Sequence, residues 1–325
     1  MRLLAAGGTI AMQGERALVA LDADALVAAV PQLGAFGPLT AETVFALPGP
    51  QIGLADALAL ARRACAAGDA GDGVVITTGT DTLEELAVLC ALLYAGHAPI
   101  VLTGANRPAS RPGADGPANL LDAVALAAAA EAAGLGVSVV FGGEIHAAMS
   151  VRQVDSTGPA AFGSPAAGPL GRIVEGRVWL HARPLRPHPV DPRSLEHRVS
   201  IITAALGDDG HLLEAAADRD DGVVLVALGA GHLPPGTLHA LRAAVERVPV
   251  LITCRVQRSA MLFATYGFEG AEPDLRASGA ICVPFLSTAA ARIALLGCLG
   301  TGLDIEAIGR ILAPWDARVN FGATP

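Results

Sequence analysis

The sequence contains no lysine: its 22 Lys+Arg residues are all arginine in a chain of 325 residues. About 20 lysines would be ordinary at this length. The absence excludes Schiff-base and pyridoxal chemistry, a P-loop and protein-kinase activity, because each needs a lysine side chain. The chain is also rich in alanine and glycine, so a coding bias toward arginine is a sufficient explanation for most of the missing lysines.

Basic charge, long apolar runs and paired cysteines are scarce too. A formal net charge of −9 leaves no basic face for nucleic acid or an anionic membrane. The apolar runs fall short of the roughly 20 residues that span a bilayer, and the apolar N-terminus stops at Gly7, too early for a signal peptide. The five cysteines lack a CxxC spacing, so we expect small core residues in a reducing cytoplasm.

Short apolar segments alternate with alanine-rich helical segments in the first half of the chain. This order predicts an α/β domain with a doubly wound, mostly parallel sheet that is covered by helices on both faces. Pro117 suits the first turn of one of these helices. The predicted strands are 2–6, 43–47, 73–77, 99–103 and 136–141, and the predicted helices are 52–67, 83–94 and 117–133.

A segment rich in proline and arginine interrupts this alternation at residues 181–197. We therefore predict an N-terminal α/β domain over 1–182, a linker over 183–197 and a smaller α/β domain over 198–325. The predicted strands of the second domain are 199–203, 222–228, 248–253 and 280–283, and its predicted helices are 237–247, 289–299 and 304–312.

Glycines and polar side chains follow two of the predicted strands. The first strand runs into Gly7-Gly8-Thr9, and the third runs into the sequence TTGTDT at 77–82. Ligands bind beyond the carboxyl ends of parallel strands, and glycine lets backbone N–H groups approach them closely. Both strand ends are therefore candidate parts of one site.

Thr80 and Asp81 are the most informative polar pair in these turns. Thr82 and Glu85 have the spacing of a helix capping box, so Thr82 needs no further role. Capping does not need Thr80 and Asp81. A hydroxyl beside a carboxylate at a helix N-terminus suits a nucleophile or oxyanion group with an acid that orients a ligand.

Metal and dinucleotide sites are not indicated. The eight histidines show no HExxH or similar spacing, so we expect them to be solvated or structural. Residues 229–235 lack the G-x-G-x-x-G order of a dinucleotide loop. Asp115 and Asn119 flank the Gly116-Pro117 turn, where a structural role is favoured.

These motifs resemble the signature segments of the bacterial-type L-asparaginase family. The resemblance covers nearly the whole chain in the family's order. It implies amide hydrolysis of a small-molecule substrate by a threonine nucleophile, no metal or cofactor, and homodimers or homotetramers with active sites between subunits. The matching segments are GGTIA at 7–11, TGTDTLEE at 78–85, VLTGANRP at 101–108, ADGPANL at 114–120, GPLGRI at 168–173, 229–234, YGFEG at 266–270 and Ala291-Arg292.

The resemblance also assigns roles to residues of this sequence. The family's first nucleophile falls on Thr9, and its second threonine and the neighbouring acid fall on Thr80 and Asp81. In the family this acid holds the α-amino group of the substrate. Gly8 and Gly79, beside the two threonines, are the implied substrate-binding glycines.

One departure from the family's pattern concerns its site lysine. The segment that usually resembles V-R-K-x-x-T-T reads VRQVDST here, so Gln153 occupies the lysine position. Glutamine can hold a hydrogen bond but has no charge and relays no proton. The loss of an acid–base partner typically costs about 10²–10⁴ in rate. Arg152 is a poor substitute, since neighbouring side chains on a strand point to opposite faces.

Three further positions depart from the pattern. The loop after Thr9 is short and carries no tyrosine to cover it. The family's serine and Gln/His pair at the substrate carboxylate reads Pro50-Gln51, which leaves Gln51 as the candidate substrate contact. The partner subunit's glutamate has no match around 259–264.

These departures leave three functions open. The first is an amidohydrolase with weak activity on L-asparagine or with another amide as substrate. The second is an enzyme of specialised metabolism that acts on an amide in a larger molecule. The third is a binding protein built on a degenerated site.

Overall fold

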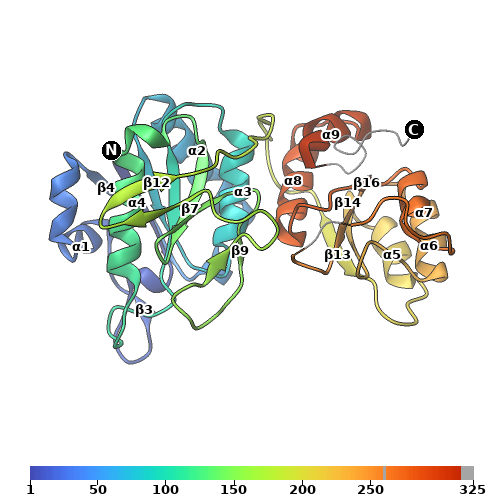
Figure 1. The fold of residues 1–325 in the computed structure, drawn as a ribbon, viewed down its shortest axis with the longest axis horizontal. Coiled ribbons are helices and arrows are strands. Elements are labelled where there is room, and N and C mark those ends of the chain that lie inside the picture. The colour runs from blue at the N-terminus through green and yellow to red at the C-terminus, as the bar shows by residue number, and fades with distance from the viewer. Residues whose placement is uncertain (259–260, 316–325) are drawn as a thin grey trace. The chain divides into compact units, whose positions relative to one another are not determined.

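The computed structural model describes residues 1–258 and 261–315 (Figure 1). The chain divides into two compact units at Pro189 and Val190, inside the proline-rich segment. Ser259, Ala260 and residues 316–325, all in the predicted second domain, lie outside the described residues.

The N-terminal unit is built on an eight-stranded sheet with the order β12-β11-β8-β7-β6-β5-β1-β4. The five strands β4, β1, β5, β6 and β7 run parallel, and β8, β11 and β12 follow beyond β7, each antiparallel to the strand before it. The strands are β1 (Arg2–Gly7), β4 (Thr40–Leu47), β5 (Val74–Thr77), β6 (Ile100–Thr103), β7 (Val137–Phe141), β8 (Glu144–Ala147), β11 (Gly171–Val174) and β12 (Arg177–Leu180).

Helices cover this sheet on both faces, which confirms the predicted fold class. All residues of β5, β6 and β7 are buried, as their apolar sequences require when both faces are covered. One face packs against α1 and α4, and α2 and α3 lie side by side on the other (Figure 1). The helices are α1 (Ala23–Ala28), α2 (Leu54–Asp69), α3 (Leu83–Leu93) and α4 (Gly116–Ala128).

α4 is shorter than the sequence predicts. Pro117 lies in its first turn as expected, but the helix ends at Ala128. Ala129 has extended backbone angles, and a separate 3₁₀ turn follows at Ala130–Ala132. The alanine run therefore does not continue the helix to Ala133.

Two small antiparallel pairs lie outside the main sheet. β2 (Met12–Gln13) pairs with β3 (Leu18–Val19), so the short loop after Thr9 is a hairpin. β9 (Arg152–Gln153) pairs with β10 (Phe162–Gly163).

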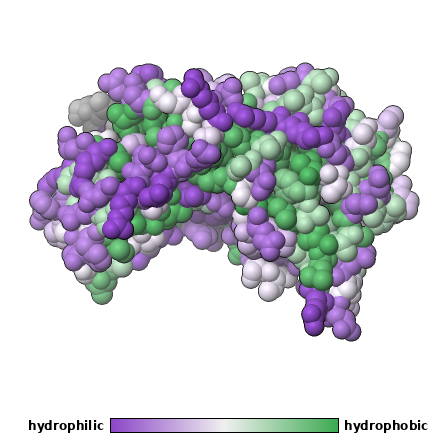
Figure 2. All heavy atoms as spheres, turned by 180° about the vertical axis from the view of Figure 1, so that it is seen from behind, coloured by the Kyte–Doolittle hydropathy of each residue, from purple (hydrophilic) through white to green (hydrophobic). Residues whose placement is uncertain are grey.

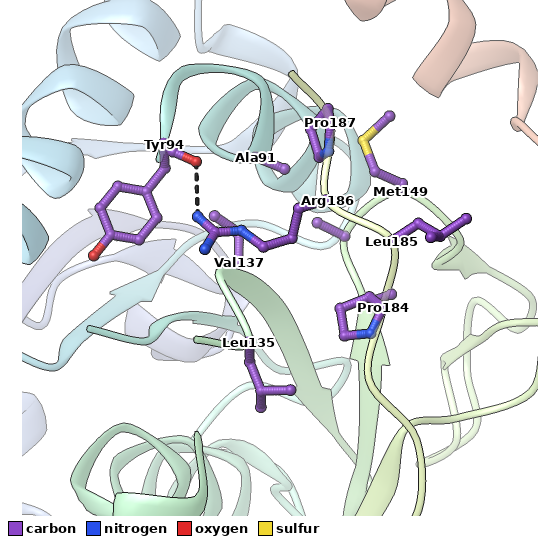
Figure 3. Close-up of a pocket in the computed structure, with 11 residues that line it drawn as sticks. Ala91, Tyr94, Leu135, Val137, Met149, Pro184, Leu185, Arg186 and Pro187 are labelled. Carbon is purple, nitrogen blue, oxygen red and sulfur yellow. Dashed lines mark hydrogen bonds between the residues drawn. The ribbon is translucent and has the colours of Figure 1, made fainter. Parts of the chain in front are cut away.

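The first residues of the predicted linker are anchored on the N-terminal unit. Arg183 donates hydrogen bonds to the carbonyls of Ala133 and Glu131, at 2.9 and 3.0 Å. Arg186 donates to the carbonyl of Tyr94 at 3.0 Å, and Figure 3 shows its guanidinium extending from the linker toward that residue. These contacts hold this part of the proline-rich segment in place.

The second unit contains a parallel sheet of four strands in sequence order. The strands are β13 (Val199–Thr203), β14 (Gly222–Ala227), β15 (Val250–Cys254) and β16 (Ile281–Cys282). Its helices are α5 (His211–Ala217), α6 (Pro235–Ala244), α7 (Glu272–Ala277), α8 (Thr288–Gly300) and α9 (Ile305–Leu312).

The cysteines and the surface agree with the composition. All five cysteines are buried, as predicted, and none is in a disulfide bond; burial raises the pKa of the Cys65 and Cys298 thiols to about 12. Figure 2 shows hydrophilic side chains spread among smaller apolar patches on one face. Among the described residues, no helix combines the length and apolar character needed to cross a bilayer.

Candidate active site

Two glycine turns meet where β1 and β5 end. Gly8 follows β1 with a φ of +77°, and a Cβ atom on it would overlap the backbone nitrogen and Cα of Gly79. Gly79 lies two residues beyond β5. The main chains are thus in direct contact, and only glycine allows this approach in a left-handed conformation. The residues that follow, Thr9 and Thr80, are brought to the same edge of the sheet.

The end of β4 adds a third segment to this edge. The N–H of Gly8 donates to the carbonyl of Leu47, the last residue of β4, at 3.0 Å. A 3₁₀ turn over Gly49–Gln51 follows, and a Cβ atom on Gly79 would lie 2.9 Å from the Cα of Gly49. Gln51, at the end of that turn, is exposed. The predicted substrate-binding segments therefore come together here.

The polar side chains at this edge differ in exposure. Thr9 opens a 3₁₀ turn and is half-buried, Thr80 is buried, and Asp81 is exposed. Thr80 and Asp81 precede α3, whose first backbone N–H groups have no partner within the helix. Two hydroxyls, a carboxylate and a helix N-terminus are thus arranged on neighbouring strand ends.

The predicted capping box at the start of α3 is wrong. Thr82 is the residue before α3, but its side chain accepts no capping hydrogen bond. The Thr82 hydroxyl instead donates to the carbonyl of Gly49 at 3.4 Å. The reason is tertiary: the turn after β4 offers an acceptor that the local sequence does not reveal.

Gln153 is held beside α3 by its backbone. Its N–H donates to Glu84 Oε2 at 2.8 Å, whereas its side-chain amide donates to the carbonyl of Asp155 at 3.5 Å. Burial raises the pKa of the Glu84 carboxyl, while the Gln153 N–H and the nearby charge of Arg152 lower it in part. Glu84 thus joins β9 to the helix that follows Thr80 and Asp81.

Glu84 was not singled out by the sequence analysis. The signal lay in the TDTLEE segment, where Glu84 stands three residues after Asp81 in the first turn of α3. An acidic residue in that position ordinarily reads as a favourable charge at a helix N-terminus. Its bond to β9 joins residues 69 positions apart, so local sequence gives no indication of it.

Asn106 and Asp115 brace the loop beside Gln153. The Asn106 side chain donates to the carbonyl of Gly158 at 2.8 Å, and the Asp115 carboxylate accepts from the N–H groups of Asn106 and Arg107. Asn119 donates to the carbonyl of Gly104 at 3.0 Å. Asp115 and Asn119 therefore have the structural contacts that the sequence analysis favours.

A buried histidine, His146, contacts the segment that follows β10. His146 of β8 is fully buried, and its Nδ1 lies 3.2 Å from Ser164 Oγ, while Nε2 lies 3.6 Å from Glu144 Oε2. Burial lowers the pKa of His146 to about 4, against a smaller opposing effect of Glu144. The neutral imidazole therefore anchors the segment that follows β10. Within residues 1–258 and 261–315, no group of three or more His, Cys, Asp and Glu is placed to hold a metal.

Comparison with known families identifies this arrangement. Residues 1–186 match the model of the N-terminal asparaginase domain, and residues 198–312 match that of the glutaminase/asparaginase C-terminal domain. This chain belongs to the asparaginase family. The resemblance of its motifs is thereby confirmed across both units.

Individual relatives cover most of the chain. It is 40% identical over 272 residues to a "Probable L-asparaginase" of Deinococcus radiodurans, spanning 82% of this chain and 83% of that protein. It is 31% identical over 322 residues to "L-asparaginase 2" of Escherichia coli K12, with 95% and 91% covered. The crystal structure of a "Probable Cytoplasmic L-asparaginase" from Campylobacter jejuni superposes with a TM-score of 0.84 at 30% identity, covering 96% of this chain and 98% of that one.

Proposed function

We propose that this protein is an amidohydrolase that cleaves a small-molecule amide, with L-asparagine, which yields L-aspartate and ammonia, as the default substrate. The observation that carries the proposal is the contact of Gly8 with Gly79, which brings Thr9 and Thr80 to one strand edge. Membership of the asparaginase family supports it. No metal or cofactor is part of the proposed reaction.

In the proposed reaction Thr9 is the nucleophile. Its hydroxyl oxygen attacks the amide carbonyl, the hydroxyl proton passes to the amide nitrogen, and the C–N bond breaks to release ammonia and leave a threonine ester. Water then hydrolyses this ester to the carboxylic acid and restores the hydroxyl. Thr80 lies buried beside the helix N-terminus, where backbone N–H groups stabilise developing negative charge. Asp81 is exposed and binds an ammonium group of the substrate. Gly8, Gly79 and Gln51 form the surrounding binding surface.

Gln153 favours a second candidate, a site that is altered in substrate or in rate. Its side-chain amide bonds to the carbonyl of Asp155 and supplies no charge to the threonine pair. We therefore expect slow hydrolysis of free asparagine, or faster hydrolysis of a different or larger amide. A binding protein without hydrolysis is the limiting case of this alteration.

Ammonia release tests the proposal. L-asparagine, L-glutamine and a panel of larger amides are assayed with the intact chain and with Thr9→Ala. We expect at least one amide to be hydrolysed and Thr9→Ala to lose about 10³-fold or more in rate. The control is Thr40→Ala, which removes an exposed threonine at the start of β4 and leaves the rate unchanged.

Three outcomes test the nucleophile and decide between the candidates. Hydrolysis that persists at the full rate in Thr9→Ala contradicts the nucleophile. If Gln153→Lys raises the rate on asparagine by tenfold or more, the substitution at 153 is what limits the enzyme. Saturable hydrolysis of asparagine with micromolar affinity by the unaltered chain contradicts the altered-substrate candidate.

We also propose that the protein is a homodimer or homotetramer.

A further inference from the structure

A short hairpin follows the proposed nucleophile. Thr9 opens the 3₁₀ turn that leads into β2, and a turn over residues 14–17 connects β2 to β3. The N–H groups of Ala20 and Leu21 both donate to the carbonyl of Ala11, at 2.9 and 3.0 Å. The base of the hairpin is therefore closed two residues beyond Thr9.

The tip of this hairpin is bonded to a loop that is distant in sequence. The Ser110 hydroxyl donates to the carbonyl of Gly14 at 3.2 Å, and Nη2 of Arg111 donates to the carbonyl of Glu15 at 3.3 Å. Two adjacent donors thus meet two adjacent acceptors, which sets one register between the hairpin and the loop. Figure 1 shows the hairpin at β3 beside the loop that leads into α4.

The loop that holds the tip, residues 104–115, is itself braced. The Asp115 carboxylate accepts from two N–H groups of the loop, those of Asn106 and Arg107, at 3.0 and 2.8 Å. Asp115 directly precedes α4, which packs on the main sheet. The two donors to the hairpin therefore stand on a segment that is tied to the core of the N-terminal unit.

The two connected segments come from strands on either side of β5. The sheet order is β6-β5-β1, with the 104–115 loop after β6 and the hairpin after β1, while β5 leads to Thr80. Ile10, next to Thr9, is 4% exposed, and a Cβ atom on Gly116 would lie 2.9 Å from its Cγ1. The hairpin is thus held at its start, base and tip beside the strand ends that carry both threonines.

We propose that Ser110 and Arg111 are positioning residues for the site at Thr9. They hold the hairpin as a fixed wall beside the nucleophile, so that this side of the binding surface is formed before the substrate arrives. Both residues act through the hairpin and not on the reacting atoms. Their effect on the reaction rests on the proposed amidase function, whereas their hold on the hairpin does not.

The hairpin needs these bonds because it is small. β2 and β3 contribute two residues each, and residues 13–16 are exposed. An isolated two-stranded hairpin is only marginally stable in water. Loss of both bonds lets the tip open, and a site that is competent for part of the time binds its substrate more weakly in proportion.

Steady-state kinetics test the positioning role. In Ser110→Ala/Arg111→Ala we expect KM for an amide that the chain hydrolyses to rise about three- to tenfold, because part of the population lacks the formed wall. We expect kcat to stay within about twofold, since bound substrate reorders the hairpin. Ser110→Thr/Arg111→Lys keeps both donors and should restore most of the KM. The control is Arg310→Ala, which removes an exposed arginine from α9 and leaves KM unchanged.

Hydrogen exchange measures the hold on the hairpin without any substrate. In Ser110→Ala/Arg111→Ala we expect the amides of residues 12–21 to exchange at least about threefold faster, while those of β5 keep their rates. Unchanged exchange over residues 12–21 overturns the hold on the hairpin. Faster exchange with unchanged KM overturns the positioning role, and so does a fall in kcat alone, which indicates a general loss of structure.

The two measurements separate this inference from the proposed function. If the unaltered chain hydrolyses no amide, the proposed function fails, and the exchange comparison alone decides whether Ser110 and Arg111 hold the hairpin. If amides are hydrolysed and the exchange over residues 12–21 does not change, the function stands and the role of the two residues is contradicted.

Discussion

Around Gly8 and Gly79 the candidate site is held by main chain, whereas around Gln153 it is held by side chains. The first region has two backbones in contact, with no room for a Cβ atom. The second depends on side chains that bond to backbone: the Glu84 and Asp155 carboxylates accept from N–H groups, and the Asn106 amide donates to a carbonyl. The predicted nucleophile lies in the first region and the substituted lysine position in the second.

This difference indicates which part of the site tolerates change. Backbone packing fixes the threonine pair, since any side chain at Gly8 displaces a strand end. Side-chain bonds can be lost one at a time, and each costs about 1–3 kcal/mol when a buried group is left unpaired. We infer that the region of Gln153 can vary while the threonine pair stays in place.

Substitution of Gly8 is expected to have the largest effect. In Gly8→Ala the new methyl group overlaps Gly79, so β1 and the turn after β5 must separate. We expect at least about 100-fold lower amidase activity, because small displacements of reacting groups cost that much. The matched control is Gly14→Ala, which has the same φ of +77° but nothing within 4 Å of its Cβ. Equal losses in the two variants would show that backbone strain, not the contact, is responsible.

Acid should lower the stability of the fold through His146, which lies outside the glycine turns of the first region. Burial lowers the pKa of His146 from 6.5 to about 4. Between these pH values its imidazole is protonated in the unfolded chain and neutral in the folded chain. Stability from this group is complete above pH 6.5 and falls toward pH 4, by up to about 3 kcal/mol. Denaturant unfolding at a series of pH values measures this. His146→Gln should flatten the slope, and an unchanged slope would contradict the assignment.

Removal of Glu84 should release β9 from α3. In Glu84→Leu the N–H of Gln153 loses its acceptor, and we expect a loss of about 1–3 kcal/mol in unfolding free energy. Glu84→Gln keeps an acceptor oxygen and should recover part of that loss. Glu306→Leu, at an exposed position in α9, is the matched control for the removal of a carboxylate. If Glu84→Leu is as stable as Glu306→Leu, the hydrogen bond from the Gln153 N–H to Glu84 contributes nothing to the stability.

The smallest expected effect is at Asn106. Asn106→Ala removes the hydrogen bond to Gly158, for which about 1 kcal/mol is expected. Hydrogen exchange at residues 155–158 should increase, while exchange in β1 and β5 stays slow. Faster exchange across both regions would contradict their independence.

The sequence predicts the parallel part of the main sheet well, for an identifiable reason. β5, β6 and β7 are apolar runs buried on both faces, and the residues that follow them indicate turns. β8, β11 and β12 were missed because polar residues such as Glu144 and Arg172 interrupt their apolar pattern, and β11 and β12 are also only partly buried. The short helices α1, α5 and α7 have too few turns to show a period.

The candidate site divides in the same way. The glycine turns beside Thr9 and Thr80 are local in sequence, and their approach follows from parallel topology. The Thr82 hydroxyl and the Glu84 carboxylate bond to Gly49 and Gln153, which are distant in sequence. Such tertiary bonds depend on the assembled fold, so the local sequence led to a wrong cap at Thr82 and gave no sign of Glu84.

The most direct test of the central claim, that Thr9 is the nucleophile, is to trap the acyl group. The protein is mixed with an amide that it hydrolyses, and the reaction is quenched in acid within one turnover. The protein is then digested with a protease that cleaves after arginine, and the peptides are measured by mass spectrometry. Cleavage after Arg2 and Arg16 isolates Thr9 from Thr80. The account predicts an acyl mass on the peptide 3–16 that is absent in Thr9→Ala. An acyl mass on the peptide that contains Thr80, with full turnover in Thr9→Ala, would contradict it.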